Sequence, residues 1–255
     1  MKFSQYLILT ENQAHYISDT DAIKMLKVKC QYAYTHNIPI YRGMPSKNEY
    51  QFGSAEFDEP RRSANTTNYS TLIIDNSPEW APYPKRSKSY ICSTDAKYAT
   101  EYGSLYKVFP FDGANIGICP ELDIWFSFHK LQSVGGITDI STFNRMLQDL
   151  FFYHYNQQDR NDTTFENIKQ GCESIDAYVK SINYDYNQLP PYKLESWERR
   201  GLEKLTRNKQ PILSNIMKVL SPSANGFEHT NIEQITKLPS HREVWTDSPC
   251  IFKRI

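Results

Sequence analysis

Three short fragments, far apart in the chain, each combine the residues of a strand with one polar group at its end. The fragments are residues 40–43 (IYRG), 89–94 (SYICST) and 242–246 (REVWT). Together they supply a guanidinium from Arg42, a hydroxyl pair from Ser93 and Thr94, and a carboxylate from Glu243. These fragments predict a fold in which strands distant in sequence hold the polar groups.

The size and charge of the chain limit what it can be. With 255 residues and 39% apolar content, it can bury one good core, which predicts a single elaborated domain or one domain with an insert. Lys plus Arg equals Asp plus Glu, at 29 each, so no overall field attracts nucleic acid or an anionic membrane.

Cysteine usage and hydropathy indicate an intracellular protein. The five cysteines are widely spaced and form no Cys-x-x-Cys or zinc-type cluster, so we expect buried, reduced thiols and no metal. No apolar run approaches the roughly 20 residues of a membrane span, and the first residues lack a signal-peptide core. We therefore expect a cytoplasmic protein, in the cell that makes it or in a target cell that receives it, with no membrane partner.

The first half of the chain is rich in predicted strands. Apolar spacing predicts a helix over residues 19–34 and a second one over 95–102, which Thr94 could cap and Gly103 ends. The predicted strands are residues 38–42, 70–74, 89–93, 104–109, 114–119 and 124–128. Between residues 43 and 88 the composition indicates a long, loop-rich excursion, which is often functional.

The sequence pattern changes from strand-like to helical after residue 136. Residues 141–155, 164–182, 194–205 and 212–220 have helical periodicity. Residues 221–240 are rich in Pro, Ser, Asn and Gly and predict a loop, after which residues 243–246 and 250–253 form a last strand or hairpin. The predicted organisation is a β-rich core of residues 1–136 and 221–255 with a helical insert at 137–220.

Each polar group has a plain structural explanation beside the functional one. Arg42 after a strand is usually a surface charge, although a guanidinium fork suits a pyrophosphate and Gly43 lets a ligand approach the backbone. Thr94 could simply cap the following helix, with Asp95 in a favourable first turn. Glu243 could pair with Arg242 or Lys253, but exposed pairs contribute only about 0–1 kcal/mol.

Taken together, the fragments resemble the Arg-Ser-Glu triad of the ADP-ribosyltransferase superfamily. The resemblance covers roughly residues 35–130 and 215–255, and it includes the helix, glycine and Tyr/Val strand that follow Ser93 and Thr94. It departs from the family at the third position of the Ser-Thr-Ser motif, which is Asp95 here. The resemblance implies an α+β fold, a split β-sandwich of the ADP-ribosyltransferase kind with a helical insertion.

The resemblance also implies a reaction and its residues. NAD would be cleaved as a substrate at its nicotinamide ribose, and ADP-ribose would move to a macromolecular acceptor, protein or nucleic acid. Arg42 would hold the phosphates of NAD, Gly43 would offer backbone groups to the carboxamide, and Ser93 with Thr94 would brace the ribose. Glu243 would stabilise an oxocarbenium-like ribose, as carboxylates do in glycoside hydrolysis.

Residues near the triad extend the predicted site. The family's acceptor residue lies two positions before the Glu, and here it is His241, which puts an arginine acceptor in doubt. A histidine could act as a base, but a lone loop histidine is more often a bystander. Tyr98 and Tyr102 could line the nicotinamide site, although core packing is an equal alternative. Residues 61–69, with Arg61, Arg62 and Asn65, could join Lys85, Arg86 and Lys88 in a basic loop that contacts phosphates or the acceptor.

Three functions are consistent with the sequence. The first is the transferase itself, and the second is an NAD glycohydrolase, in which water is the acceptor. The third is a non-catalytic module that binds nucleic acid or protein through the basic loop. Release of nicotinamide separates the first two from the third, and product analysis separates the first from the second.

Overall fold

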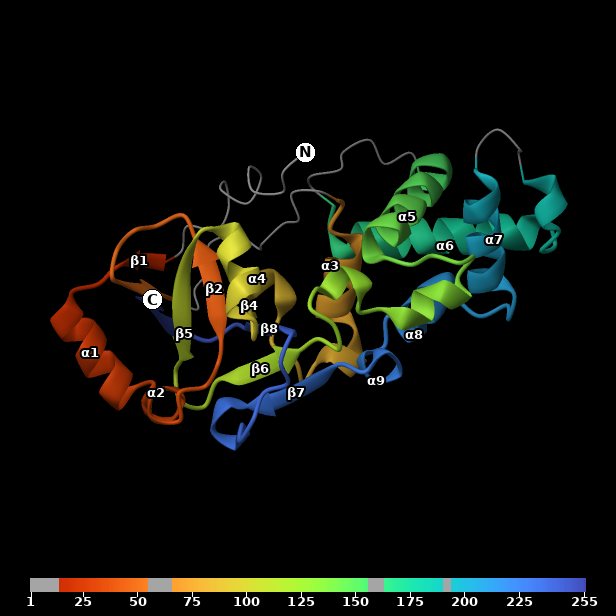
Figure 1. Cartoon of the computed structure of the whole chain (residues 1–255). Helices are drawn as coiled ribbons and strands as arrows, with labels where there is room; N and C mark the ends of the chain where they lie inside the picture. The colour runs from red at the N-terminus through yellow and green to blue at the C-terminus, as the bar shows by residue number, and fades with distance from the viewer. Residues whose placement is uncertain (1–13, 55–65, 156–162, 190–193) are drawn as a thin grey trace. The chain divides into compact units, whose positions relative to one another are not determined.

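The computed structural model describes residues 14–54, 66–155, 163–189 and 194–255 (Figure 1). By contacts the chain divides into two compact units. The first consists of residues 1–64, 82–123 and 227–255, and the second of residues 65–81 and 124–226. The predicted insert began at residue 137, whereas the second unit begins at 124 and also includes 65–81.

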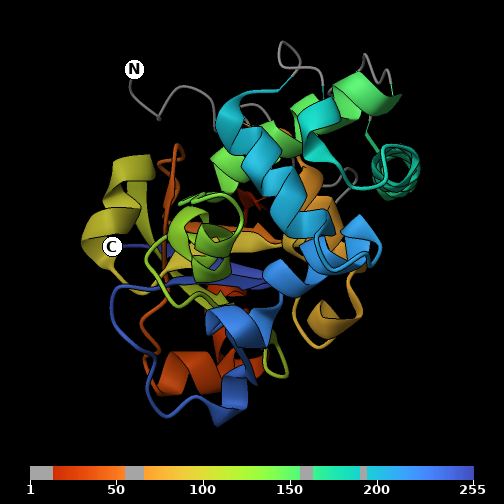
Figure 2. The same ribbon diagram turned by 90° about the vertical axis from the view of Figure 1, so that its right-hand side faces the viewer.

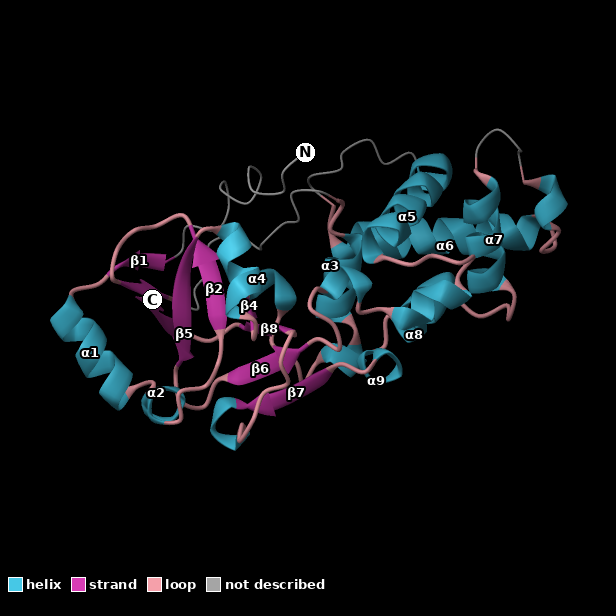
Figure 3. Ribbon diagram, viewed as in Figure 1, coloured by secondary structure: helices cyan, strands magenta, loops and turns pink. Residues whose placement is uncertain are grey.

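Antiparallel strands make up the centre of the first unit, as Figure 3 shows in magenta. Among the described residues one open sheet has the order β1-β3-β9-β5-β2-β4-β8-β6-β7. The strands are β1 (Ala14–Tyr16), β2 (Tyr41–Met44), β3 (Tyr50–Gly53), β4 (Tyr90–Ser93), β5 (Ser104–Pro110), β6 (Asn115–Ile118), β7 (Glu228–Asn231), β8 (Glu243–Thr246) and β9 (Cys250–Arg254). The predicted mixture of helices and strands is confirmed, and the strands form an antiparallel sheet.

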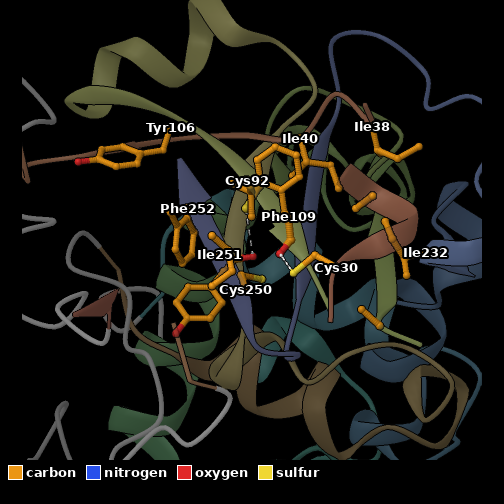
Figure 4. Close-up of a cluster of buried hydrophobic side chains, with 14 of the residues drawn as sticks. Cys30, Ile38, Ile40, Cys92, Tyr106, Phe109, Ile232, Cys250, Ile251 and Phe252 are labelled. Carbon is orange, nitrogen blue, oxygen red and sulfur yellow. Dashed lines mark hydrogen bonds between the residues drawn. The ribbon is translucent and has the colours of Figure 1, made fainter. Parts of the chain in front are cut away.

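The core of this unit lies between one face of the sheet and two helices, α1 (Asp19–Val28) and α2 (Gln31–Thr35). Figure 4 shows the buried side chains, among them Tyr106, Phe252 and three cysteines (Figure 4). All five cysteines are unbridged and buried, as predicted. Burial, followed by the charge of Asp112, raises the pKa of Cys30 to about 12, so this thiol stays protonated in the core.

The sheet changes partners between β2 and β4. Most neighbouring strands pair over two to five positions, but β2 pairs with β4 at Tyr41 and Ser93 alone. On one side of this pair, β2 continues along β5 over four positions, and on the other β4 continues along β8 over four. Two longer stretches of sheet therefore meet at a single pair of residues.

The short helix α4 (Ala96–Ala99) follows β4 and lies against β2. Two glycines permit this close approach. A Cβ on Gly43 would lie 2.1 Å from the carbonyl oxygen of Ala99, and one on Gly103, which has a φ of 133°, would lie 2.5 Å from the carbonyl oxygen of Met44. The backbone contact at these positions is therefore open only to glycine.

The second unit is helical in its described part, and Figure 2 shows α5 to α8 in green to blue (Figure 2). Its helices are α3 (Tyr69–Asn76), α5 (Ile140–Tyr155), α6 (Phe165–Ser181), α7 (Ser196–Thr206), α8 (Ile212–Val219) and α9 (Pro222–Asn225). The apolar face predicted for α5 is fully buried, with Phe143, Met146, Leu147, Leu150 and Phe151 at 0% exposure. Each such side chain stabilises the unit by about 1.5–3 kcal/mol.

Three local predictions are wrong. Residues 70–74, predicted as a strand, belong to helix α3, where Ile73 and Ile74 face the core and β-branched residues yield to packing. Residues 124–128 contain a short 3-10 helix instead of a strand. The helix α4 is capped by Asp95, whose carboxylate accepts from the backbone of Lys97 and Tyr98, and not by Thr94. Within the described residues, no helix is both long and apolar enough to cross a bilayer.

Glu198 makes the stability of the second unit depend on pH. This buried residue closes the N-terminal turn of α7, where its carboxyl accepts from the backbone N–H of Glu195 at 2.7 Å. Burial, and then the neighbouring carboxyl of Asp149, raise its pKa from 4.5 to about 7. Because the pKa of Glu198 is higher in the folded state than in the unfolded state, its protonation favours the folded state. This contribution to the free energy of unfolding is complete below pH 4.5 and is lost as pH rises through 7.

We therefore expect Glu198→Gln to remove one component of the pH dependence. Between pH 5 and pH 8 the wild-type melting temperature should fall further than that of the variant, as measured by thermal unfolding. Glu203→Gln, at a half-buried position on the same helix, is the control. Parallel curves for wild type and Glu198→Gln would show that Glu198 keeps an ordinary pKa.

Candidate active site

Two of the predicted catalytic residues face each other across neighbouring strands. Ser93 of β4 pairs with Glu243 of β8 on one side and with Tyr41 of β2 on the other. Directly paired residues point to the same face of a sheet. Both Ser93 and Glu243 are largely buried, at 5% and 8% exposure, so the sheet forms a sheltered row that ends in a carboxylate.

Arg42 is adjacent to this row but occupies the other face of β2. It pairs with Tyr106, a core residue, while its neighbour Tyr41 pairs with Ser93. Its guanidinium donates to the carbonyl of Ile91. Burial raises the pKa of the nearby Tyr90 phenol, and the charge of Arg42 offsets part of that increase. The structure thus brings Ser93 and Glu243 together but directs Arg42 away from them.

The guanidinium that contacts Glu243 belongs to Arg86. Nη1 of Arg86 lies 2.7 Å from Oε1 of Glu243, with both side chains only 10% exposed. Burial lowers the pKa of Arg86, but the carboxylate of Glu243 more than offsets this, and the net pKa is raised. Arg86 also lies over the ring of Trp245, 5.6 Å from its centroid.

No pattern in the sequence indicates this pair. Arg86 was predicted in a basic loop with Lys85 and Lys88, and those two are exposed as expected. Arg86 instead lies in a 3-10 turn, Arg86–Lys88, and is buried. Nothing in the spacing of charges along residues 85–88 distinguishes the buried cation from the solvated ones.

Further contacts hold Glu243 in place. The thiol of Cys119 donates to Oε1 of Glu243 at 3.6 Å. The backbone adds bonds from Cys119 N–H to the Glu243 carbonyl at 2.9 Å and from Glu243 N–H to the Glu121 carbonyl at 3.0 Å. The carboxylate is therefore fixed by its own strand, by the end of β6 and by Arg86.

Ser93 and Thr94 fasten the segment that leads into β8. The Thr94 hydroxyl accepts from the N–H of Arg242 at 2.9 Å, and the N–H of Thr94 donates to the Arg242 carbonyl at 2.9 Å. The Ser93 hydroxyl accepts from the N–H of Asp95 at 2.9 Å and donates to the Arg242 carbonyl at 3.4 Å. These hydroxyls position the backbone immediately before Glu243.

Tyr98 and Tyr102 form a hydrogen-bonded aromatic pair whose pKa values respond to the charge of Glu243. The Tyr102 hydroxyl donates to that of Tyr98 at 3.0 Å, which donates to Oδ2 of Asp123 at 3.3 Å. Burial raises the pKa of both phenols, and the charges of Asp123 and Glu243 raise them further. The two side chains predicted to line the site therefore lie within the electrostatic reach of Glu243. Asp123 joins them, although no sequence pattern indicated a role for it.

The remaining predicted site residues lie in different surroundings or outside the described residues. The close approach at Gly43 is made by the chain itself, since Ala99 and Tyr102 fill the space where a Cβ would lie. His241 has a left-handed backbone, with φ 54°, and its Nδ1 lies 2.6 Å from Oδ2 of Asp95. Arg61, Arg62 and Asn65, predicted to bind the acceptor, lie outside the described residues.

A cavity in the helical unit offers charge without catalytic groups. It has a volume of about 350 Å³, and Lys204, Arg207 and Lys218 line it together with Asn208 and Asn215. Its lining contains three cationic side chains and no carboxylate, so its charge suits an anion. In the part of the chain that is described, no group of three His, Cys, Asp or Glu is arranged for a metal ion.

We expect Arg86→Met to lower the free energy of unfolding by more than the change in side-chain size alone would. The change leaves Glu243 buried without its cation, which costs about 3–5 kcal/mol for pairs of this kind. Urea unfolding should show that loss, and adding Glu243→Gln in the same chain should recover much of it, as a double-mutant cycle measures.

The exposed Lys88→Met is the matched control, with an expected change within about 0.5 kcal/mol. If Arg86→Met and Lys88→Met had equal stability, or if the two changes at the pair were additive, the buried ion pair would have no energetic role.

Comparison with known proteins does not place the chain in a family: no family model, no curated protein and no solved structure matches it.

Proposed function

We propose that this protein cleaves NAD at the N-glycosidic bond between nicotinamide and ribose and transfers ADP-ribose to a macromolecular acceptor. The observation that carries the proposal is the buried Glu243, paired in register with Ser93 and fixed by Arg86 and Cys119. A carboxylate this sheltered serves stability poorly, because burying an ion pair costs several kcal/mol per ion in desolvation.

The reaction requires such a carboxylate. When nicotinamide leaves, positive charge develops on the ribose, and an anion already fixed in place stabilises that charge without reorganising. Arg86 would hold the carboxylate of Glu243 in place before NAD binds. The contacts of Cys119 and the backbone would keep the carboxylate in one orientation.

The surrounding residues support binding of the nicotinamide ribose. Tyr98 and Tyr102 lie in a T-shaped arrangement with ring centroids 5.6 Å apart, and their linked hydroxyls fix both rings. They would form an aromatic wall for the nicotinamide. Ser93 would act mainly through the backbone it fastens, which brings Glu243 to the ribose hydroxyls.

The sheet also supports the finer fold prediction. The change of partners at Tyr41 and Ser93 is what a split β-sandwich of the ADP-ribosyltransferase kind needs, since two stretches of sheet can diverge from one pair. In that arrangement NAD would bind where the stretches part. Arg42, on the opposite face, would reach the phosphates only if its guanidinium left the Ile91 carbonyl, so Arg86 is the better candidate for a cation near the ligand.

The test is Glu243→Gln. We expect it to lower the rate of nicotinamide release about 100-fold or more, as loss of a preorganised charge does, while the Kd for NAD changes only a few-fold. Nicotinamide release from labelled NAD and calorimetric binding measure the two quantities. Thermal unfolding of the variant shows whether the fold persists.

The exposed Glu101→Gln, next to Tyr102 in sequence, is the control and should keep wild-type turnover. Full activity in Glu243→Gln would refute the proposal. Label that remains as free ADP-ribose in a cell lysate would indicate a glycohydrolase, and label removed by protease or by nuclease would identify a protein or a nucleic-acid acceptor.

A further inference from the structure

Asp95 and His241, two residues at which the chain departs from the pattern of the family it resembles, contact each other. Asp95 holds the third position of the Ser-Thr-Ser motif, and His241 lies two residues before Glu243. The Nδ1 of His241 is 2.6 Å from Oδ2 of Asp95. Two departures 146 positions apart in sequence thus form one pair.

Both oxygens of Asp95 are committed. Oδ1 accepts from the N–H groups of Lys97 at 2.9 Å and Tyr98 at 3.3 Å, which cap helix α4, while Oδ2 faces the histidine. Partial burial acts to raise the pKa of Asp95, but the hydrogen bonds from Tyr98 and His241 outweigh it and lower the pKa. Asp95 is therefore an ionised carboxylate in a fixed orientation.

His241 is equally well placed. Its backbone is left-handed, and the hydrogen bonds between the backbone of Arg242 and Thr94 hold the residue that follows it. Since a carboxylate only accepts, the Nδ1 of neutral His241 carries the proton and Nε2 keeps its lone pair. The side chain is 69% exposed, and within the described residues Nε2 has no hydrogen-bond partner.

The position relative to Glu243 suits an acceptor that approaches the ribose. His241 lies two residues before Glu243, and its imidazole is exposed to solvent whereas the carboxylate of Glu243 is buried. The same helix that receives Asp95 at its N-terminus carries Tyr98, whose pKa responds to the charge of Glu243. An acceptor could contact His241 while the ribose contacts Glu243.

We propose that His241 is the general base that takes the proton from an incoming hydroxyl acceptor, and that Asp95 is its positioning residue. This inference rests on the proposed function. A carboxylate behind an imidazole is the arrangement that activates hydroxyl nucleophiles in other enzymes. A neutral imidazole has no charge with which to attract a guanidinium, whereas a hydroxyl can donate directly to its Nε2.

The step balances without another reactant. The acceptor oxygen bonds to C1′ of the ribose, and the bond from C1′ to the nicotinamide nitrogen breaks. That electron pair neutralises the pyridinium, so nicotinamide leaves uncharged. The acceptor proton passes to Nε2 of His241, which becomes imidazolium beside the ionised Asp95.

The experiment compares His241→Asn and Asp95→Asn with the wild-type chain. Asn tolerates a left-handed backbone and also caps helices well, so both variants should keep the local structure. Labelled NAD is incubated with methanol as the hydroxyl probe or with agmatine as the guanidino probe, and nicotinamide and the glycoside products are measured. Added imidazole tests chemical rescue.

We expect the wild type to form the methyl glycoside in preference to the agmatine product. His241→Asn should lower kcat about 100-fold, within the range of general-base catalysis, with an unchanged KM for NAD. Imidazole should restore His241→Asn but not Glu243→Gln. Asp95→Asn should also lower kcat at constant KM. His36→Ala, at the end of α2, is the control and should resemble wild type.

The two proposals fail in different ways. If the wild type releases no nicotinamide, the proposed function fails, and the base falls with it. If the wild type is active and Glu243→Gln is not, but His241→Asn keeps kcat within about twofold, only the role of the base is overturned. A preference for agmatine would overturn the hydroxyl class of acceptor.

Discussion

The pairing of Tyr41, Ser93 and Glu243 across three adjacent strands is the constraint on which the first unit depends. It joins two stretches of antiparallel sheet that share no other position between β2 and β4. Several described site residues are held next to this row: the hydroxyls of Ser93 and Thr94 bind the segment that enters β8, and α4 begins immediately after them. The site therefore occupies the place where the sheet is least continuous.

A buried carboxylate at such a seam needs a cation. Arg86 provides it from a short turn before β4, and its position over Trp245 keeps the guanidinium against β8. The interior of a protein strengthens this attraction but also makes an unpaired charge very unfavourable. Stability and the proposed chemistry are thus linked through the same two side chains, because loss of Arg86 would leave Glu243 buried without its counterion.

The sequence predicted those parts of the structure that depend on local pattern. Helices α5 to α8 of the second unit follow apolar periodicity, and the strands that carry Ser93 and Glu243 begin and end nearly where their residues indicate. It could not predict Arg86, because burial of one cation among several is decided by where Trp245 and Glu243 lie in space. The sequence also led us to expect Arg42 beside Ser93 and Glu243, which the structure does not show. A strand pattern shows which residues alternate between the two faces, but it does not show the register with a neighbouring strand.

The order of strands has a consequence for how the chain is made. β8 and β9 follow every other strand in sequence, yet β9 lies between β3 and β5, and β8 between β4 and β6. Neither stretch of sheet can close before these strands are synthesised, whereas the helices of the second unit make contacts nearby in sequence and fold faster. On the ribosome, the helical unit would form first, and the carboxylate of Glu243 would meet its partners only as the last strands emerge, so no partial chain would carry a complete site.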